Sequence, residues 1–126
     1  MQLNGKKALI TGASGGIGGA IAKALVAAGA TVAISGTRVE ALEALNAELG
    51  GVAAVLPCNL TDAAAVDALP GQAEAALGGL DILVCNAGVT KDGLAMRMKD
   101  EDFESVIAIN LIATFRLNRA VLKPFM

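Results

Sequence analysis

Five of the eight residues from Gly12 to Gly19 are glycines, in the stretch Gly-Ala-Ser-Gly-Gly-Ile-Gly-Gly. Each glycine inside a helix costs about 1 kcal/mol relative to alanine, so this density indicates a need for backbone without side chains. Glycine backbone admits a bulky anion, and the start of a helix supplies unpaired N–H groups and the positive end of its dipole. The stretch therefore predicts binding of a phosphate group, above all a pyrophosphate.

The flanking residues predict how the glycines are positioned. Residues 7–11 form a short apolar run that ends in a β-branched residue, which is typical of a buried strand. Beyond the glycines, apolar residues recur at helical spacing until Gly29; they are Ile17, Ile21, Ala24, Leu25 and Ala28. The glycines are therefore a strand-to-helix turn. The alternative is a tight connection that binds no ligand.

The rest of the chain repeats the same alternation of strand and helix. Further strands are predicted at 31–35, 52–56 and 80–85, and helices at 39–49, 62–77 and about 100–123. Pro70-Gly71 is expected to kink or split the helix at 62–77. Apolar strands between amphipathic helices predict an α/β fold, a Rossmann-like three-layer sandwich with helices on both faces of a four-stranded parallel sheet. Right-handed crossovers give the strand order 3-2-1-4, which places the glycine turn at the switch point where ligands bind.

Composition excludes several classes of protein. The chain of 126 residues is 55% hydrophobic and 17% charged, with a net charge of −2, so neither disorder nor nucleic-acid binding is indicated. No apolar run has the length of a membrane span, and no cleavable signal pattern is present, so a cytoplasmic location is expected. The sequence has no His, Tyr or Trp, which excludes histidine bases, histidine metal ligands and tyrosine acids within these residues. We expect no metal site.

Two cysteines, Cys58 and Cys85, follow or end predicted strands 3 and 4. In the order 3-2-1-4 these strands lie three spacings apart, or roughly 14 Å at about 4.8 Å for each spacing. A disulfide needs Cα atoms within about 7 Å. We therefore expect two free thiols with structural roles.

Several motifs in order resemble those of the short-chain dehydrogenase/reductase family. Residues 11–18 resemble its TGxxxGIG turn, and Cys85-Asn86-Ala87-Gly88 resembles its NNAG motif with Cys in place of the first Asn. Asn110 matches the family's asparagine in the following helix. Within the family, residues 59–62 and 88–98 are most similar to 3-oxoacyl-[acyl-carrier-protein] reductases of fatty acid synthesis. The resemblance implies that residues 1–126 are the N-terminal dinucleotide-binding half of such a fold.

The resemblance also implies roles for individual residues. The pyrophosphate of the cofactor would be held by residues of the glycine turn, namely Gly12, Ser14, Gly15, Gly16, Ile17 and Gly18. Asn59 and Leu60 would lie beside the adenine, and Asn86, Ala87 and Gly88 on the ribose and nicotinamide side. Asn110 would belong to the proton relay, the alternative being a core asparagine satisfied by backbone. Asn86 is also expected to brace two strands.

The end of the second predicted strand indicates which nicotinamide cofactor is bound. NAD-binding folds carry an acidic residue there that bonds the ribose 2′-hydroxyl, but this chain reads Ser35-Gly36-Thr37-Arg38. A hydroxyl at Thr37 and a guanidinium at Arg38 favour a 2′-phosphate. NADP(H) is therefore predicted, unless Arg38 is a solvated residue at the start of a helix.

The 126 residues lack the family's catalytic half, namely a fifth strand with Ser and a helix with Tyr-x-x-x-Lys. Without Tyr no acid is available for the carbonyl oxygen, so the chain alone is expected to be inactive. One hypothesis is the cofactor-binding part of a reductase whose full-length form meets acyl carrier protein. The alternatives are a truncated or engineered α/β module that self-associates without catalysis, and a nucleotide-sensing module.

Self-association is expected in either case. The family's fifth strand would cover strand 4, so an apolar edge at Ile82, Leu83 and Val84 is left bare. Apolar residues also surround most of the last helix, which predicts burial on more than one side. A homodimer or larger closed assembly is predicted, with contact through this edge, the last helix or both.

Overall fold

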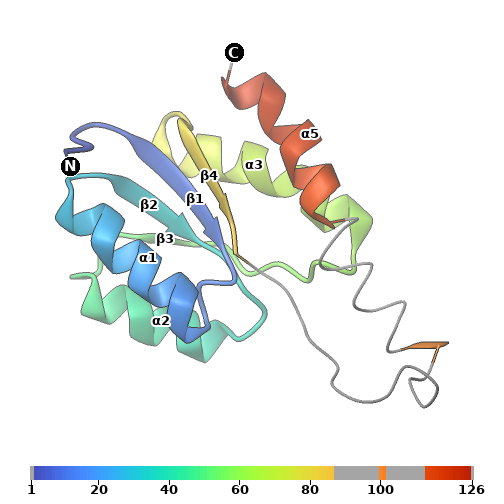
Figure 1. The fold of residues 1–126 in the computed structure, drawn as a ribbon, viewed down its shortest axis with the longest axis horizontal. Helices are drawn as coiled ribbons and strands as arrows, with labels where there is room; N and C mark the ends of the chain where they lie inside the picture. Colours follow the sequence, from blue (N-terminus) through green and yellow to red (C-terminus); the bar gives the residue numbers. More distant parts are fainter. Residues whose placement is uncertain (1, 87–99, 102–112, 126) are drawn as a thin grey trace.

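The computed structural model describes residues 2–86, 100–101 and 113–125. Strands and helices alternate along these residues (Figure 1). In chain order they are β1 (Lys7–Thr11), α1 (Gly16–Ala27), β2 (Thr31–Ile34), α2 (Val39–Glu48), β3 (Ala54–Val55), α3 (Ala63–Leu77), β4 (Ile82–Cys85) and α5 (Ala113–Phe125). None of the helices in the described part of the chain is long and apolar enough to cross a membrane.

The strands form one parallel sheet in the order β3-β2-β1-β4. Leu9 at the centre of β1 lies opposite Ala33 of β2 on one side and Leu83 of β4 on the other. This order confirms the predicted α/β fold and brings the end of β1 into the middle of the sheet. Because all strands run the same way, their carboxyl ends meet at one edge.

Successive side chains of the central strands point to opposite faces of the sheet, and each face carries its own hydrophobic core. On one face Ile10 and Ile34 pack with α1 and α2, and on the other Leu9 packs with α3 and α5. Figure 1 shows this division, with α1 and α2 together on one side of the strands. Helices therefore cover both faces, as the apolar character of the strands predicts.

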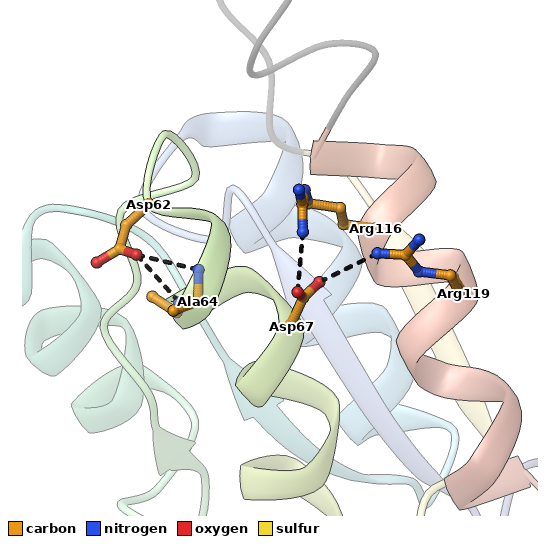
Figure 2. Close-up of polar contacts among 6 residues, drawn as sticks. Asp62, Ala64, Asp67, Arg116 and Arg119 are labelled. Atoms are coloured by element: carbon orange, nitrogen blue, oxygen red, sulfur yellow. Dashed lines mark hydrogen bonds and ion pairs between the residues drawn. The ribbon is translucent and has the colours of Figure 1, made fainter.

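Helix α3 corrects the expectation of a split at Pro70-Gly71. It runs without a split from Ala63 to Leu77, with Pro70 inside it. Proline lacks the N–H that a helix interior uses, but the ring of Pro70 is fully buried, and this packing offsets the lost hydrogen bond. The helix starts at a side-chain cap, in which Asp62 accepts from the N–H groups of Ala64 and Ala65 (Figure 2).

Helix α5 lies against α3 through both apolar and charged contacts. Leu117 and Val121 are buried in the core below it. On the surface, Arg116 donates to Asp67 of α3 at 2.9 Å, and a nitrogen of Arg119 lies 4.0 Å from the same carboxylate (Figure 2). The predicted helix at 100–123 is thus present from residue 113 and ends at Phe125, while 102–112 lie outside the described residues.

The edge strand β3 is shorter than the sequence predicts, with two residues in place of five. The residues that follow β3 are nevertheless still hydrogen-bonded to β2 and to the loop after it. Leu56 N donates to Ile34 O at 2.9 Å, and Cys58 N donates to Gly36 O at 3.0 Å. This extension carries Cys58 alongside the end of β2.

Candidate functional site

The glycines between β1 and α1 meet two different requirements. Gly12 has a φ of +67°, which side chains rarely adopt. A Cβ on Gly18 would contact the backbone of Gly12 and lie 2.9 Å from Ala13 Cα, so close packing of helix and strand excludes one. By contrast, a Cβ on Gly15 would lie 3.7 Å from its nearest neighbour, and one on Gly16 would meet no atom within 4 Å. The fold itself does not need glycine at Gly15 or Gly16.

The N-terminus of α1 lies at these two open glycines. Gly15 is the N-cap, no side chain caps the helix, and its first turn holds no acidic residue. Its leading N–H groups and the positive end of its dipole are therefore available to an anion. Ile17 in the same turn is 73% exposed, which is unusual for a large apolar side chain.

A cavity of about 390 Å³ lies beside this turn, at the carboxyl ends of all four strands. Its walls are formed by Thr11, Gly12, Ser14, Gly15, Gly16, Ile17, Ser35, Gly36, Thr37, Arg38, Cys58, Asn59, Leu60 and Asn86. No carboxylate is among these residues. The cavity therefore joins the uncapped helix to a wall that carries hydroxyls, amides and one guanidinium.

Arg38 closes the side of the cavity that follows β2. It is exposed, and its Nη2 donates to the carbonyl oxygen of Ser14 at 2.9 Å. Gly36 lies beneath this contact, where a Cβ would be 2.8 Å from Ser14 Oγ. The loop after β2 thus packs directly against the glycine turn, and a positive charge lies at their junction.

Asn86 ties the end of β4 to the glycine turn. Its backbone N–H donates to Thr11 Oγ1 at 3.2 Å, and its Nδ2 lies 3.4 Å from Gly12 O. The Thr11 hydroxyl in turn donates to Val84 O at 3.3 Å. These contacts confirm that Asn86 braces two strands; a contact with cofactor remains a prediction.

Asn59 forms a tight turn at the opposite wall. Its Oδ1 accepts from the N–H of Thr61 at 3.0 Å and from the Thr61 hydroxyl at 2.7 Å. The turn leads into the Asp62 cap of α3. Since the side-chain oxygen is used in this way, only the amide NH₂ of Asn59 is left for a ligand.

The cavity brings together most of the residues predicted to bind cofactor. The exception among the described ones is Gly18, which is buried below the turn and does not line the cavity. Ala87, Gly88 and Asn110 lie outside the described residues. Four wall residues were not predicted, namely Thr11, Ser35, Gly36 and Cys58; their places at strand ends were the available signal.

The two cysteines are free, as predicted. Cys58 is 7% exposed, whereas Cys85 is exposed and does not line the cavity. Burial raises the pKa of the Cys58 thiol, and the negative charge of Asp62 raises it further. The Cys85 thiol is partly shielded from solvent although the residue is exposed, and this raises its pKa too. No cluster of three or more potential metal ligands occurs within the described residues.

The family model for short chain dehydrogenases matches residues 6–126. Nodulation protein G of Rhizobium sp. (strain N33) is 56% identical over 125 residues, which are 99% of this chain and 51% of that protein. The 3-oxoacyl-[acyl-carrier-protein] reductase FabG of Rickettsia bellii is 53% identical over 126 residues, which are 100% of this chain and 51% of the relative. The chain thus spans about half the length of these curated relatives.

Solved structures resemble the whole described fold. A short chain dehydrogenase from Burkholderia cenocepacia J2315 in complex with NADP has a TM-score of 0.93 and 35% identity, covering 98% of this chain and 52% of that one. A 3-ketoacyl-(acyl-carrier-protein) reductase from Brucella melitensis complexed with NADH has a TM-score of 0.92 and 33% identity, covering 98% and 51%. The two neighbours hold different nicotinamide nucleotides.

Proposed function

The chain belongs to the short chain dehydrogenase family, and from that premise we propose that it binds NADP(H) as the nucleotide-binding part of a protein like the 3-oxoacyl-[acyl-carrier-protein] reductases. The observation that carries this proposal is the uncapped N-terminus of α1, which faces the cavity across two open glycines. A pyrophosphate there accepts hydrogen bonds from backbone N–H groups and lies at the positive end of the helix dipole.

The remaining walls fit the other parts of a dinucleotide. Asn59 and Leu60 line the side proposed for adenine, and Asn86 lines the side proposed for nicotinamide and its ribose. Ala87 and Gly88 are proposed to continue that second side. This division follows the direction of the sheet, in which β3 and β4 are the two opposite edges.

Arg38 supports NADP(H) over NAD(H). Its guanidinium is already held at the junction of Ser14 and the loop after β2, and no wall residue is acidic. A 2′-phosphate gains a charge-assisted hydrogen bond there, whereas a 2′-hydroxyl finds no carboxylate to accept its proton.

The proposed parent reaction is reduction of a 3-oxoacyl thioester, and the nicotinamide supplies the hydride when it is bound. The part of this chain is to hold the nucleotide and fix its orientation. The 126 residues contain no Tyr to protonate the carbonyl oxygen, so we propose that they do not catalyse the reaction alone. Asn110 is proposed to join the proton relay of a full-length protein. Acyl carrier protein is proposed to bind to that full-length protein and not to the 126 residues alone.

Titration of the purified chain with NADPH and NADH, followed by nucleotide fluorescence and calorimetry, tests the proposal. We expect saturable binding at one site, with NADPH bound at least about tenfold more tightly than NADH, since a hydrogen bond to a charged group contributes about 1.5–3 kcal/mol. Absence of binding for both nucleotides would contradict the proposal. Equal affinities would contradict the assignment of Arg38 alone.

We also propose that two copies of the chain associate. Strand β4 pairs with β1 on one side and with no other described strand, and its Ile82, Leu83 and Val84 are only partly buried. Leu122 on α5 is 59% exposed. An open strand edge beside an exposed apolar helix residue favours a second copy as the partner.

A further inference from the structure

The loop after β2 is fixed to its neighbours by backbone hydrogen bonds on two sides. Toward the glycine turn, Ala13 N donates to Ser35 O at 3.0 Å. Toward the segment after β3, Gly36 O accepts from Cys58 N, also at 3.0 Å. The loop cannot move away from the glycine turn without breaking such bonds, so the distance between the two is set by the sheet.

Gly36 is the point at which this loop approaches the glycine turn most closely. A Cβ on Gly36 would lie 2.8 Å from Ser14 Oγ, 3.2 Å from Ser14 Cβ and 3.4 Å from Cδ2 of Leu42, which is fully buried. The φ of Gly36 is not positive, so space and not backbone conformation requires glycine there. Rotation of the Ser14 hydroxyl would relieve the shortest contact. Ser14 Cβ, however, moves only with the backbone, so a side chain at position 36 would displace the backbone of Ser14.

The same backbone holds the guanidinium of Arg38. Ser14 O accepts from Arg38 Nη2 at 2.9 Å, and within the part of the chain that the structure describes the guanidinium makes no other hydrogen bond or ion pair. A guanidinium has five N–H donors, so this bond leaves the others for a ligand. A shift of the Ser14 carbonyl would therefore release an exposed side chain from its one described anchor.

We propose that Gly36 is a positioning residue for Arg38 and that it strengthens the preference for a 2′-phosphate without contacting the phosphate. This inference rests on the proposed function, because it concerns the nucleotide assigned to the same cavity. Fixing an arginine side chain costs conformational entropy, and the packing of Gly36 on Ser14 lets the fold supply that order before the ligand arrives. NADH has no 2′-phosphate, so its binding should not depend on this packing.

Gly36→Ala tests the proposal through the ratio of the NADPH and NADH affinities, measured by calorimetry. We expect the preference for NADPH to fall about five- to twentyfold, and NADH binding to change by less than about twofold. A methyl group that merely blocked the cavity would weaken both nucleotides equally and leave the ratio unchanged. Gly71→Ala is the matched control, because a Cβ there meets no atom within 4 Å and Gly71 lies in α3, outside the cavity walls.

A second-site variant shows whether the effect passes through Ser14. Ser14→Gly removes the Cβ and hydroxyl that the new methyl group would meet, and it keeps the carbonyl that Arg38 uses. In that background Gly36→Ala should change the preference by less than about twofold, since the close contact no longer exists. Any loss caused by the missing Ser14 hydroxyl is common to both chains and cancels in the comparison.

Circular dichroism establishes whether each variant folds. If Gly36→Ala alone does not fold, the comparison is made in a Ser14→Ala background, where only the 3.2 Å contact with the Cβ remains. There Gly36→Ala should still lower the preference, by at least about threefold.

The order of the Arg38 side chain can be measured without nucleotide, by ¹⁵N relaxation of its Nε–H group. We expect it to be restricted in the wild-type chain and mobile in Gly36→Ala. Arg116, which donates to Asp67 at 2.9 Å far from the loop in sequence, should be unchanged and serves as internal reference. Loss of the signal in Arg38→Lys assigns it.

Three results would overturn the inference. An unchanged affinity ratio in folded Gly36→Ala would do so, and so would an equal fall in the Ser14→Gly background. An Arg38 side chain equally ordered in both ligand-free chains would exclude positioning by Gly36. If wild type binds neither nucleotide, the proposed function fails and the effect on preference with it, whereas the relaxation measurement still decides whether Gly36 positions Arg38.

Discussion

The guanidinium of Arg38 donates to the carbonyl oxygen of Ser14 at 2.9 Å, and so joins the start of α2 to the glycine turn. This contact holds a long, exposed side chain in one place before any ligand arrives. Pre-ordering reduces the conformational entropy lost on binding, which is large for arginine. Arg38 is therefore the residue on which we expect the nucleotide preference to depend most directly.

Replacement of Arg38 by Asp is expected to weaken NADPH binding about 10–100-fold and to change NADH binding much less. The variant removes a charge-assisted hydrogen bond and places a negative charge beside the 2′-phosphate. Calorimetric titration of both nucleotides measures the change. Lys6→Asp makes the same change in net charge outside the cavity walls and should leave the preference intact. An unaltered preference in Arg38→Asp would assign the selection to other residues.

Two glycine-to-alanine variants separate folding from binding in the glycine turn. Gly18→Ala inserts a methyl group against the backbone of Gly12 and Ala13, so its free energy of unfolding should fall by about 1–3 kcal/mol. Gly16→Ala meets no protein atom within 4 Å, so its stability should be unchanged or rise by up to about 1 kcal/mol.

Although Gly16→Ala should leave stability unchanged or raised, it should weaken nucleotide binding. The added methyl group occupies the space proposed for the pyrophosphate, so the dissociation constant of NADPH should rise at least about tenfold in a chain that is fully folded. Urea unfolding and nucleotide titration of the same samples measure both quantities. Unimpaired binding by Gly16→Ala would place the pyrophosphate elsewhere.

The buried thiol at Cys58 predicts a loss of stability at alkaline pH. Its pKa is raised in the folded chain, first by burial and then by the charge of Asp62. The folded state therefore holds the thiol proton more tightly than the unfolded state, so this group's contribution to stability is fully present below the unfolded pKa. It is lost as pH rises toward the folded value.

Urea unfolding at several pH values between about 7 and 10 should show this decline, because the unfolded thiol titrates near pH 8.5. Cys58→Ala removes the titrating group and should flatten the pH dependence. Cys85→Ala serves as the comparison for the second raised thiol. An identical slope in wild type and Cys58→Ala would contradict the prediction.

The strands and the position of the glycine turn could be predicted from sequence because they depend on local patterns, and the handedness of the crossovers then gives the order of the sheet. Apolar runs, helical spacing and glycine each report on a few neighbouring residues. The place of Cys58 in the cavity wall could not be predicted in the same way. Cys58 lines the same cavity as Ser35. Its backbone N–H donates to Gly36 O, and this hydrogen bond joins distant parts of the chain.

Pro70 also shows where local patterns fail, because here packing in the folded chain overrides a local signal. Its local effect is to kink or break a helix, and that effect alone predicts a kink or a split in α3. Burial of its ring against the rest of the fold outweighs the missing hydrogen bond. The resemblance likewise implies only a place beside adenine for Asn59, whereas the structure shows that its side-chain oxygen also closes a turn with Thr61.

The 126-residue chain is expected to show no reduction of acetoacetyl thioesters by NADPH, even where it binds the nucleotide. Reduction of a carbonyl needs a proton donor for its oxygen, and the sequence contains neither Tyr nor His. Following NADPH absorbance in a preparation freed of host reductases measures turnover, with a full-length 3-oxoacyl reductase as positive control. Turnover that co-purifies with the chain and is lost in Gly16→Ala would contradict this expectation.

Association of two chains is the last prediction, and it depends on the edge of β4 and on α5. The partly exposed edge residues of β4 offer N–H and C=O groups to a further strand, and Leu122 of α5 is 59% exposed. We expect light scattering over a wide range of concentrations to give a dimer or a larger closed assembly, with a two-fold axis in the simplest case. A mass that stays at the 12.6 kDa of one chain at high concentration would contradict association itself.

Charged substitutions distinguish the two possible contacts. Cys85→Lys places a charge at the exposed end of β4, and Leu122→Glu places one on the helix. The variant that changes the element forming the interface should shift the assembly toward monomer. Val52→Lys is the matched control, because Val52 is 65% exposed and belongs to neither element. An assembly that survives both charged variants must use another surface. Association would then stand, but neither the strand edge nor α5 would explain it.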